Sequence, residues 1–258
     1  MSQHFSTTRF RLMLKLHWAE SGRYYLLSFA LTIGAMLLLM LPIVGTSQFN
    51  SLLYILHILI LFGGTMLGGC LFTTTAFAAY SSPGRGIASI MVPASRLEKL
   101  APVLLISLLG STLVFIIGLQ LHERITALAT QNIMPGGKYN PIPSEVLEFF
   151  RYIYFVLQGA TFLGSLYFTK NSLVKTIGAV LIVTLVAFVF NLLLAYHYTE
   201  YPRSIDAFPF TFWKIFEPQQ RYTITYPEPI GDLVKLIPGL IVVALIGITY
   251  VRLREKEI

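Results

Sequence analysis

Residues 80–102, YSSPGRGIASIMVPASRLEKLAP, separate the second and third long apolar segments of the chain. Pro83 and the glycine that follows it favour a turn, because proline fixes one backbone dihedral and glycine tolerates the left-handed conformation. Ser95 and Glu98 have the spacing of a capping box, in which each residue accepts a hydrogen bond from the backbone amide of the other. The sequence therefore predicts a helix that begins near Arg96 and leads into the third apolar segment.

Two interpretations of this stretch are open. Three cations, Arg85, Arg96 and Lys99, accompany the single acid Glu98, which suits a loop that faces the cytoplasm. The stretch is either a solvated loop that ends in a well-capped helix, or a stiff docking surface for a cytoplasmic partner with an apolar face at helical spacing. The residues of this partner-coupling surface would be Ser82, Pro83, Arg85, Gly86, Ile87, Ile90, Met91, Pro93, Ser95, Arg96, Glu98 and Lys99.

The composition is that of an integral membrane protein. Of 258 residues, 55% are hydrophobic and only 12% are charged, whereas soluble domains carry about 25% charged residues. The chain is expected to be all-α, with six apolar segments long enough to cross a bilayer as helices. The predicted spans are residues 24–44, 51–79, 103–121, 149–168, 172–196 and 233–251.

The first 23 residues are basic and contain Trp18 among apolar positions. A basic, tryptophan-bearing amphipathic helix is typical of a segment that lies on the inner leaflet of a membrane. A cleavable signal peptide fits less well, because no A-x-A site follows the apolar run. We therefore expect residues 1–23 to form an interfacial helix ahead of the first span.

The charge distribution predicts the orientation of the spans. With the N-terminus inside, the inner segments contain twelve cations and four carboxylates, and the outer segments contain seven cations and eight carboxylates. This bias places both termini and residues 80–102 in the cytoplasm. The net charge of +7 does not indicate a nucleic-acid partner, because the cations lie between apolar segments and not on one face of a soluble fold.

No catalytic, metal or cofactor set assembles from the sequence. Residues 122–126 begin like the zinc motif H-E-x-x-H, but Thr126 replaces the second histidine. Residues 136–139 resemble the end of a phosphate-binding loop, but Asn132 and Tyr139 stand where that pattern needs glycine and a serine or threonine. Cys70 is the only cysteine, so an intrachain disulfide and a C-x-x-C site are excluded. We expect no enzyme activity on this chain.

The second segment contains a face of small residues, Gly63, Gly64, Gly68 and Gly69. Small residues at G-x-x-x-G spacing let helix backbones approach closely in a membrane. This face is interpreted as a helix-packing surface, within the bundle or across a dimer, and the alternative is a substrate groove.

Few polar residues lie within the apolar segments: His57, Gln158, Asn191, Lys175 and Lys235. Such residues normally face the interior of a bundle, although His57 is close enough to the start of its segment to lie at the headgroup level. The absence of a series of carboxylates argues against a carrier driven by protons or sodium.

Two outer loops are long. The first covers residues 122–148, and the second, residues 198–232, is rich in aromatic residues and proline. Aromatic residues at this density favour the membrane interface. The second loop is interpreted as dipping partly into the outer leaflet, with a folded extracellular cap as the alternative.

The chain resembles the permease subunits of ABC-2-type transporters, in particular compact bacterial ones. The resemblance rests on the basic start followed by six spans, on the Ser82-Pro83-x-Arg85-Gly86 pattern, and on the run VPASRLEK at residues 92–99. It implies an interfacial elbow helix at residues 1–23 and a coupling helix at residues 80–99 that contacts a separate ABC ATPase subunit. It also implies a second permease chain, location in the bacterial plasma (inner) membrane, and short re-entrant helices before the last span.

One departure from the family is the length of the loop at residues 122–148, which leaves room for an auxiliary membrane subunit. Two other classes of function stay open. One is a membrane-embedded enzyme, for which no nucleophile, base or metal set is visible. The other is a non-transporting membrane assembly or signalling subunit of a cell-envelope complex.

Overall fold

The computed structural model describes residues 5–45, 51–74, 92, 94–132, 142–168, 170–199, 204–209, 212–216, 221–225, 227 and 230–256. Six long helices account for most of them: α1 (Thr7–Val44), α2 (Ser51–Thr74), α5 (Arg96–Asn132), α6 (Ser144–Tyr167), α7 (Ser172–Tyr198) and α8 (Ile230–Lys256). Each is long and apolar enough to cross a membrane, which confirms the prediction of a mostly all-α chain with six such helices.

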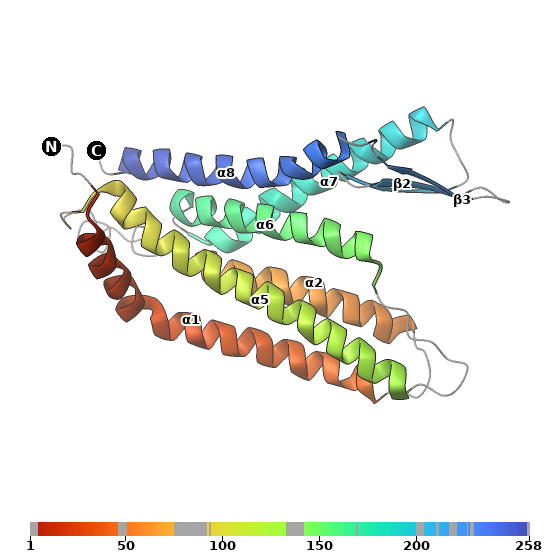
Figure 1. Ribbon diagram of the computed structural model, residues 1–258, viewed down its shortest axis with the longest axis horizontal. Helices are drawn as coiled ribbons and strands as arrows, with labels where there is room; N and C mark the ends of the chain where they lie inside the picture. Colours follow the sequence, from red (N-terminus) through yellow and green to blue (C-terminus); the bar gives the residue numbers. More distant parts are fainter. Residues whose placement is uncertain are drawn as a thin grey trace.

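The helices lie side by side along the long axis of the molecule (Figure 1). Helix α1 packs against α2 and α5, α2 also contacts α6, and α6 contacts both α7 and α8. Contacts near Glu98 join the starts of α1 and α5, and a contact near Asn132 joins their ends, so these two helices run parallel. Leu253, close to the end of α8, packs against Leu100, close to the start of α5. The start of α1 and the end of α8 therefore lie at the same end of the bundle, which we call the Glu98 end.

Helix α1 is continuous where the sequence predicted an interfacial helix followed by a separate span. One helix covers Thr7–Val44, and its N-terminal turns lie at an angle to the rest (Figure 1). The sequence offers a cause, because Ser21 and Gly22 form the kind of small-residue pair at which helices bend. The Trp18 ring lies 3.1 Å from the position that a Cβ atom on Gly22 would occupy.

Helix α5 is longer than the predicted span 103–121, and the outer loop expected to begin at residue 122 is helical as far as Asn132. The reason is burial on one helix face. Ile125 and Ala129, four residues apart, are buried against the last turns of α1, and the Asn132 side chain donates to the Val44 carbonyl oxygen at 2.8 Å. Residues 133–141 lie outside the described part of the chain.

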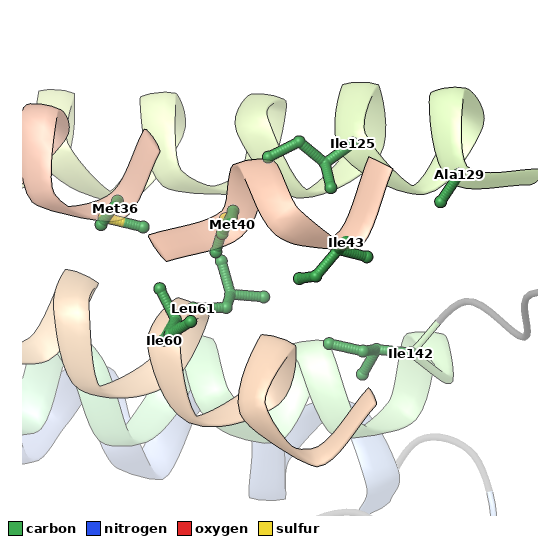
Figure 2. Packing of buried hydrophobic residues seen from close by; sticks show 8 residues of the cluster. All are labelled: Met36, Met40, Ile43, Ile60, Leu61, Ile125, Ala129 and Ile142. Atoms are coloured by element: carbon green, nitrogen blue, oxygen red, sulfur yellow. The ribbon is translucent and has the colours of Figure 1, made fainter. Parts of the chain in front are cut away.

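The largest buried cluster joins α1, α2 and α5 at the end of the bundle opposite to Glu98 (Figure 2). Leu61 of α2 and Met40 of α1 point toward each other in this cluster, and both are fully buried. The cluster consists of Met36, Met40, Ile43, Ile60, Leu61, Ile125, Ala129 and Ile142. Its branched and flexible apolar side chains fill the space between three helices, which fixes α5 beyond the predicted span.

Helices α6 and α8 also differ from the predicted bounds. Helix α6 begins at Ser144, where the span was predicted from residue 149, and α8 covers Ile230–Lys256, where residues 233–251 were expected. Ion pairs three residues apart extend α8 past its apolar part: Asp232 with Lys235, and Glu255 with Arg252. Such pairs support helix formation at exposed ends. Residues 75–79 of the predicted second span lie outside the described residues.

The last outer loop contains a three-stranded antiparallel sheet. Its strands are β1 (Ser204–Phe208), β2 (Phe212–Phe216) and β3 (Arg221–Thr225), in the order β1-β2-β3. The short re-entrant helices implied by the family resemblance are wrong for these residues. Apolar and polar side chains alternate in β3 and in most of β1, and pairing places Ile205 opposite Ile215 and Ala207 opposite Trp213 on one face. Alternation with a period of two is the signature of a half-buried strand.

The apolar face of the sheet packs against the C-terminal part of α7. Ile205, Ala207 and Ile215 are buried against Ala195, and the Trp213 indole Nε1 donates to Asn191 Oδ1 at 3.3 Å. Asn191, one of the few polar residues predicted within a span, therefore has a role in attaching the sheet to α7.

Candidate functional site

The described part of the predicted partner-coupling surface is the start of α5. Ser95, Arg96, Glu98 and Lys99 are described there. The other eight residues, Ser82, Pro83, Arg85, Gly86, Ile87, Ile90, Met91 and Pro93, lie outside the described residues. The contacts that Glu98 makes define the candidate site.

The predicted capping box is present. The Ser95 amide donates to Glu98 Oε2 at 2.7 Å, and the Glu98 amide donates to Ser95 Oγ at 3.3 Å. Helix α5 begins at Arg96, so the helix start predicted from the S-x-x-E spacing is confirmed.

The second oxygen of Glu98 joins this helix start to the beginning of α1. The Ser6 amide donates to Glu98 Oε1 at 2.5 Å, and the Arg9 guanidinium lies 3.3 Å from the same oxygen. Glu98 is fully buried, whereas the Arg9 side chain is 38% exposed. We call these four residues, Ser6, Arg9, Ser95 and Glu98, the Glu98 junction.

The partners of Glu98 explain how a carboxylate is tolerated without contact with solvent. A buried charge is stable only when it is paired and its lone pairs accept hydrogen bonds. Here two backbone amides and one guanidinium group donate to the two oxygens. Bonds of this charge-assisted kind are the stronger hydrogen bonds in proteins. The junction therefore holds the starts of α1 and α5 together, and a displacement of one is transmitted to the other.

The residues beside Glu98 differ in their exposure. Lys99, a predicted member of the partner-coupling surface, is buried, with 6% of its surface exposed. Arg96 is half-buried, and Leu97 is 51% exposed. On the next turn, Leu100 is buried against α6 and α8. The start of α5 is thus held by α1 through Glu98 and by α6 and α8 through Leu100. Leu97 is an exposed apolar residue between these contacts.

The predicted glycine face contacts two different helices. A methyl group on Gly64 would lie 2.8 Å from Met36 Cγ of α1, and one on Gly68 would overlap the Thr32 side chain of the same helix. A methyl group on Gly69 would instead overlap Tyr154 of α6. For Gly63, no heavy atom lies within 4 Å of that position. Gly64 and Gly68 therefore allow α1 to approach α2, and Gly69 allows α6 to approach.

Beside Gly69, a group of buried polar side chains connects α2 with α6. The Thr73 and Thr161 hydroxyl oxygens are 2.6 Å apart, and Thr73 also donates to Gln158 Oε1 at 3.3 Å. The Tyr154 hydroxyl donates to the Ser111 carbonyl oxygen of α5 at 2.5 Å. Gln158, predicted to face the bundle interior, is 1% exposed. These bonds satisfy polar groups that have no access to water within an apolar bundle.

Two histidines form a buried pair between α2 and α5. His122 Nδ1 lies 3.0 Å from His57 Nε2, and both side chains are buried. His57 therefore faces the interior of the bundle, as expected for a polar residue within a span, and its depth relative to the headgroups stays a prediction. Within the described residues, no group of three histidine, cysteine or acidic side chains could hold a metal ion. One imidazole donates to the other, as neutral rings can.

The two lysines predicted near span ends have separate surroundings. Lys235 Nζ lies 3.8 Å from Asp232 Oδ1 on the same helix. Lys175 Nζ lies 5.4 Å from the centre of the Phe168 ring, at the connection between α6 and α7. Neither lysine faces the interior of the bundle.

A scan of protein-family models and searches among curated proteins and solved structures find no match to this chain. A proposal for the function of this chain therefore rests on its sequence and on the contacts described above.

Proposed function

We propose that this chain is the membrane-spanning permease subunit of an ABC-2-type exporter in the bacterial plasma (inner) membrane. A separate ATPase subunit would hydrolyse ATP, and a second permease chain would complete the export path. Six apolar helices and the resemblance carried by residues 82–86 and 92–99 support this proposal. The alternative, a non-transporting assembly or signalling subunit of a cell-envelope complex, shares the six helices but requires no ATPase.

The Glu98 junction is the observation that carries the proposal. A permease driven by a separate ATPase needs a stiff connection between the surface that contacts the ATPase and the helices that cross the membrane. The junction is such a connection, because Glu98 bonds to Ser6 and Arg9 of the chain's first helix as well as to Ser95. A loop that only linked α2 to α5 would not need a carboxylate buried against the start of α1.

The orientation proposed here places the Glu98 end in the cytoplasm. Arg9 and Arg96 lie at this end with the start of α1 and the start of α5, and Arg252 lies there with the end of α8. Cations near span ends favour the cytoplasmic side. In this orientation, residues 80–99 face the ATPase, and the sheet β1–β3 lies outside.

Helix α7 offers a surface for the second permease chain or for lipid. Only Thr176 and Ala195 are buried on it within the described residues, and its apolar side chains include Leu185 and Phe190, which are 66% and 63% exposed. Apolar side chains on this scale are covered by lipid or by another chain in a membrane protein.

Copurification with an ABC ATPase tests the proposal. The full chain carries an affinity tag and is expressed together with an ABC ATPase subunit from the same bacterium; association and ATP hydrolysis are then measured in detergent. We expect a stable complex with stimulated hydrolysis. Ile90→Asp should weaken association, because it places a charge on the apolar surface expected to contact the ATPase.

Lys214→Asp, a charge change in the sheet at the opposite end, is the matched control and should leave association unchanged. A wild-type chain that associates with no ATPase, and copurifies with an envelope complex in its place, would favour the assembly or signalling function. Normal association and hydrolysis in the Ile90 variant would reduce residues 80–99 to a connecting loop.

A further inference from the structure

At the Glu98 end, two cations lie against two neighbouring aromatic rings. The Arg252 guanidinium carbon is 5.2 Å from the centre of the Tyr167 ring, and Lys175 Nζ is 5.4 Å from the centre of the Phe168 ring. The two rings are 5.1 Å apart in an edge-to-face arrangement. We call Tyr167, Phe168, Lys175 and Arg252 the cation–aromatic cluster. It draws its residues from the end of α6, the start of α7 and the end of α8.

The cluster lies where the apolar parts of three helices end. Leu253, next to Arg252, packs against Leu100 at the start of α5, which fixes the level of the cluster along the bundle. Tyr167 is 57% exposed and Val174, on the first turn of α7, is 70% exposed. Exposed aromatic rings beside cations at helix ends are typical of the level at which lipid headgroups lie.

The local charge favours an anion. Lys170 is exposed in the same connection, and the one carboxylate that the described residues pair with the cluster is Glu255, which binds Arg252. Arg252 Nε is buried and has no hydrogen-bond partner among the described residues. Arg252 Nη1 pairs with Glu255 and the Arg252 side chain is 43% exposed, so the guanidinium group has further N–H donors besides that one.

The backbone of the connection adds further donors. Asn171 adopts a left-handed conformation, with φ of 53°, and its side chain makes no capping hydrogen bond to α7. The first amides of an α-helix have no partner within the helix, and α7 has 27 residues. A helix start of this kind attracts anions, phosphate groups in particular. Lys175 stands one turn from it.

We propose that the cation–aromatic cluster binds the phosphate of an anionic phospholipid. Arg252 and Lys175 supply the charge, with Arg252 able to bind a phosphate through more than one N–H group. Tyr167 and Phe168 supply an apolar surface for the glycerol region, and Val174 leads from it to the exposed apolar side of α7. That apolar continuation favours a lipid over free phosphate as the ligand. This site does not depend on the proposed transport function.

Lipid binding by the purified full chain tests the site. Delipidated protein in detergent is titrated with phosphatidylglycerol or with phosphatidylcholine, and native mass spectrometry counts the bound lipids. We expect phosphatidylglycerol to be retained more strongly. Lys175→Gln with Arg252→Gln should lower its affinity about tenfold or more, because each cation near an anionic headgroup contributes about a fivefold effect.

Arg151→Gln with Lys214→Gln is the matched control. Both residues also lie over aromatic rings, Arg151 at 5.6 Å from the Tyr152 ring centre and Lys214 at 4.6 Å from that of Phe212, but away from the Glu98 end. This variant should retain phosphatidylglycerol at the cluster like the wild type. The charge-conserving variant Lys175→Arg with Arg252→Lys should retain most of the binding and separates loss of charge from loss of folding.

Three results would overturn the proposal. The first is equal retention of the two lipids by the wild type. The second is unchanged phosphatidylglycerol affinity in the double glutamine variant. The third is displacement of phosphatidylglycerol by inorganic phosphate at equal concentration, which would identify a site for a soluble anion and not for a lipid.

Discussion

The backbone amide of Ser6 donates a hydrogen bond to Glu98 Oε1 over 2.5 Å, although 92 residues separate the two in sequence. The same carboxylate accepts the Ser95 amide through its other oxygen. One side chain thus caps α5 and fixes the start of α1.

Replacement of Glu98 by glutamine should lower the thermal stability of the protein more than capping alone predicts. The amide keeps the size of the side chain but removes the charge that pairs with Arg9, and it leaves a donor in a place where Ser6 and Ser95 also donate. Buried polar groups without matched partners are destabilising. The melting temperature of the purified protein in detergent measures the effect.

Glu255→Gln is the control for Glu98→Gln, because Glu255 forms an exposed pair with Arg252 on one helix and such pairs contribute little to stability. We expect a clear fall in melting temperature for the Glu98 variant and almost none for the Glu255 variant. Equal effects in the two variants would contradict the structural role of the junction.

Alanine substitutions on the glycine face should change the free energy of unfolding by amounts that depend on the position. Gly68→Ala should cost about 1–3 kcal/mol, because its methyl group would overlap Thr32, whose β-branched side chain has little freedom in a helix. Gly64→Ala should cost less, because it meets the flexible Met36 side chain. Gly63→Ala, the matched control, should be neutral or stabilising by up to about 1 kcal/mol through helix propensity. Unfolding in detergent measures the order, and a Gly68 variant as stable as the Gly63 variant would contradict it.

The contributions of His57 and His122 to the free energy of unfolding should depend on each other. His57→Phe or His122→Phe alone leaves the other imidazole without this partner, at a cost of about 1–3 kcal/mol. The double variant should cost less than the sum of the single variants, by about 0.5–3 kcal/mol. A double-mutant cycle of unfolding free energies checks this. Strict additivity would mean that the short distance between the rings contributes no interaction.

The attachment of the sheet to α7 should depend on the indole of Trp213. Trp213→Phe keeps an aromatic side chain against α7 but loses the hydrogen bond to Asn191, at a cost of about 1 kcal/mol. Thr223→Val, an exposed position on β3, is the control and should have no effect. Limited proteolysis of the loop measures the detachment of the sheet. Equal protease sensitivity in both variants would show that this bond does not hold the sheet.

Accessibility of introduced cysteines should establish the orientation. Cys70 is buried, so labelling of the native thiol should give a low background. Thr223→Cys, exposed on β3, should react with a membrane-impermeant maleimide in intact cells, whereas Arg254→Cys should react only after permeabilisation. Lys99 would be a poor probe because it is buried. Labelling of the Arg254 variant in intact cells would reverse the proposed orientation.

Much of the helical fold could be predicted from local sequence. Apolar segments identify the six helices because a bilayer requires long apolar stretches, and the capping box at Ser95 and Glu98 located the start of α5 because both partners lie within one turn. The ends were predicted less well. The helical extension that contains Ile125 and Ala129 is only weakly apolar, and it is stabilised by contact with α1, which hydropathy does not report.

The rest of the candidate site depends on contacts between distant residues. Nothing local to Glu98 indicates Ser6 or Arg9 as partners, and nothing local to His57 indicates His122, 65 residues away. The sheet did leave a signal, the alternation of apolar and polar residues in β3 and in most of β1. Each strand has five residues, which is a usual strand length, but the central strand β2 has apolar residues on both faces and shows no alternation. The density of aromatic residues in this loop favoured a membrane location instead.

The bond between Ser6 and Glu98 also sets an order of events during biosynthesis. At a translation rate of about 5–20 residues per second, Glu98 is made roughly 5 to 18 seconds after Ser6. During that interval α1 and α2 are synthesised, and the Ser6 amide still lacks its acceptor. The N-terminal end of α1 is therefore fixed only once the start of α5 has been synthesised. A pause in translation shortly before residue 98 would prolong the time during which the start of α1 is not held by Glu98.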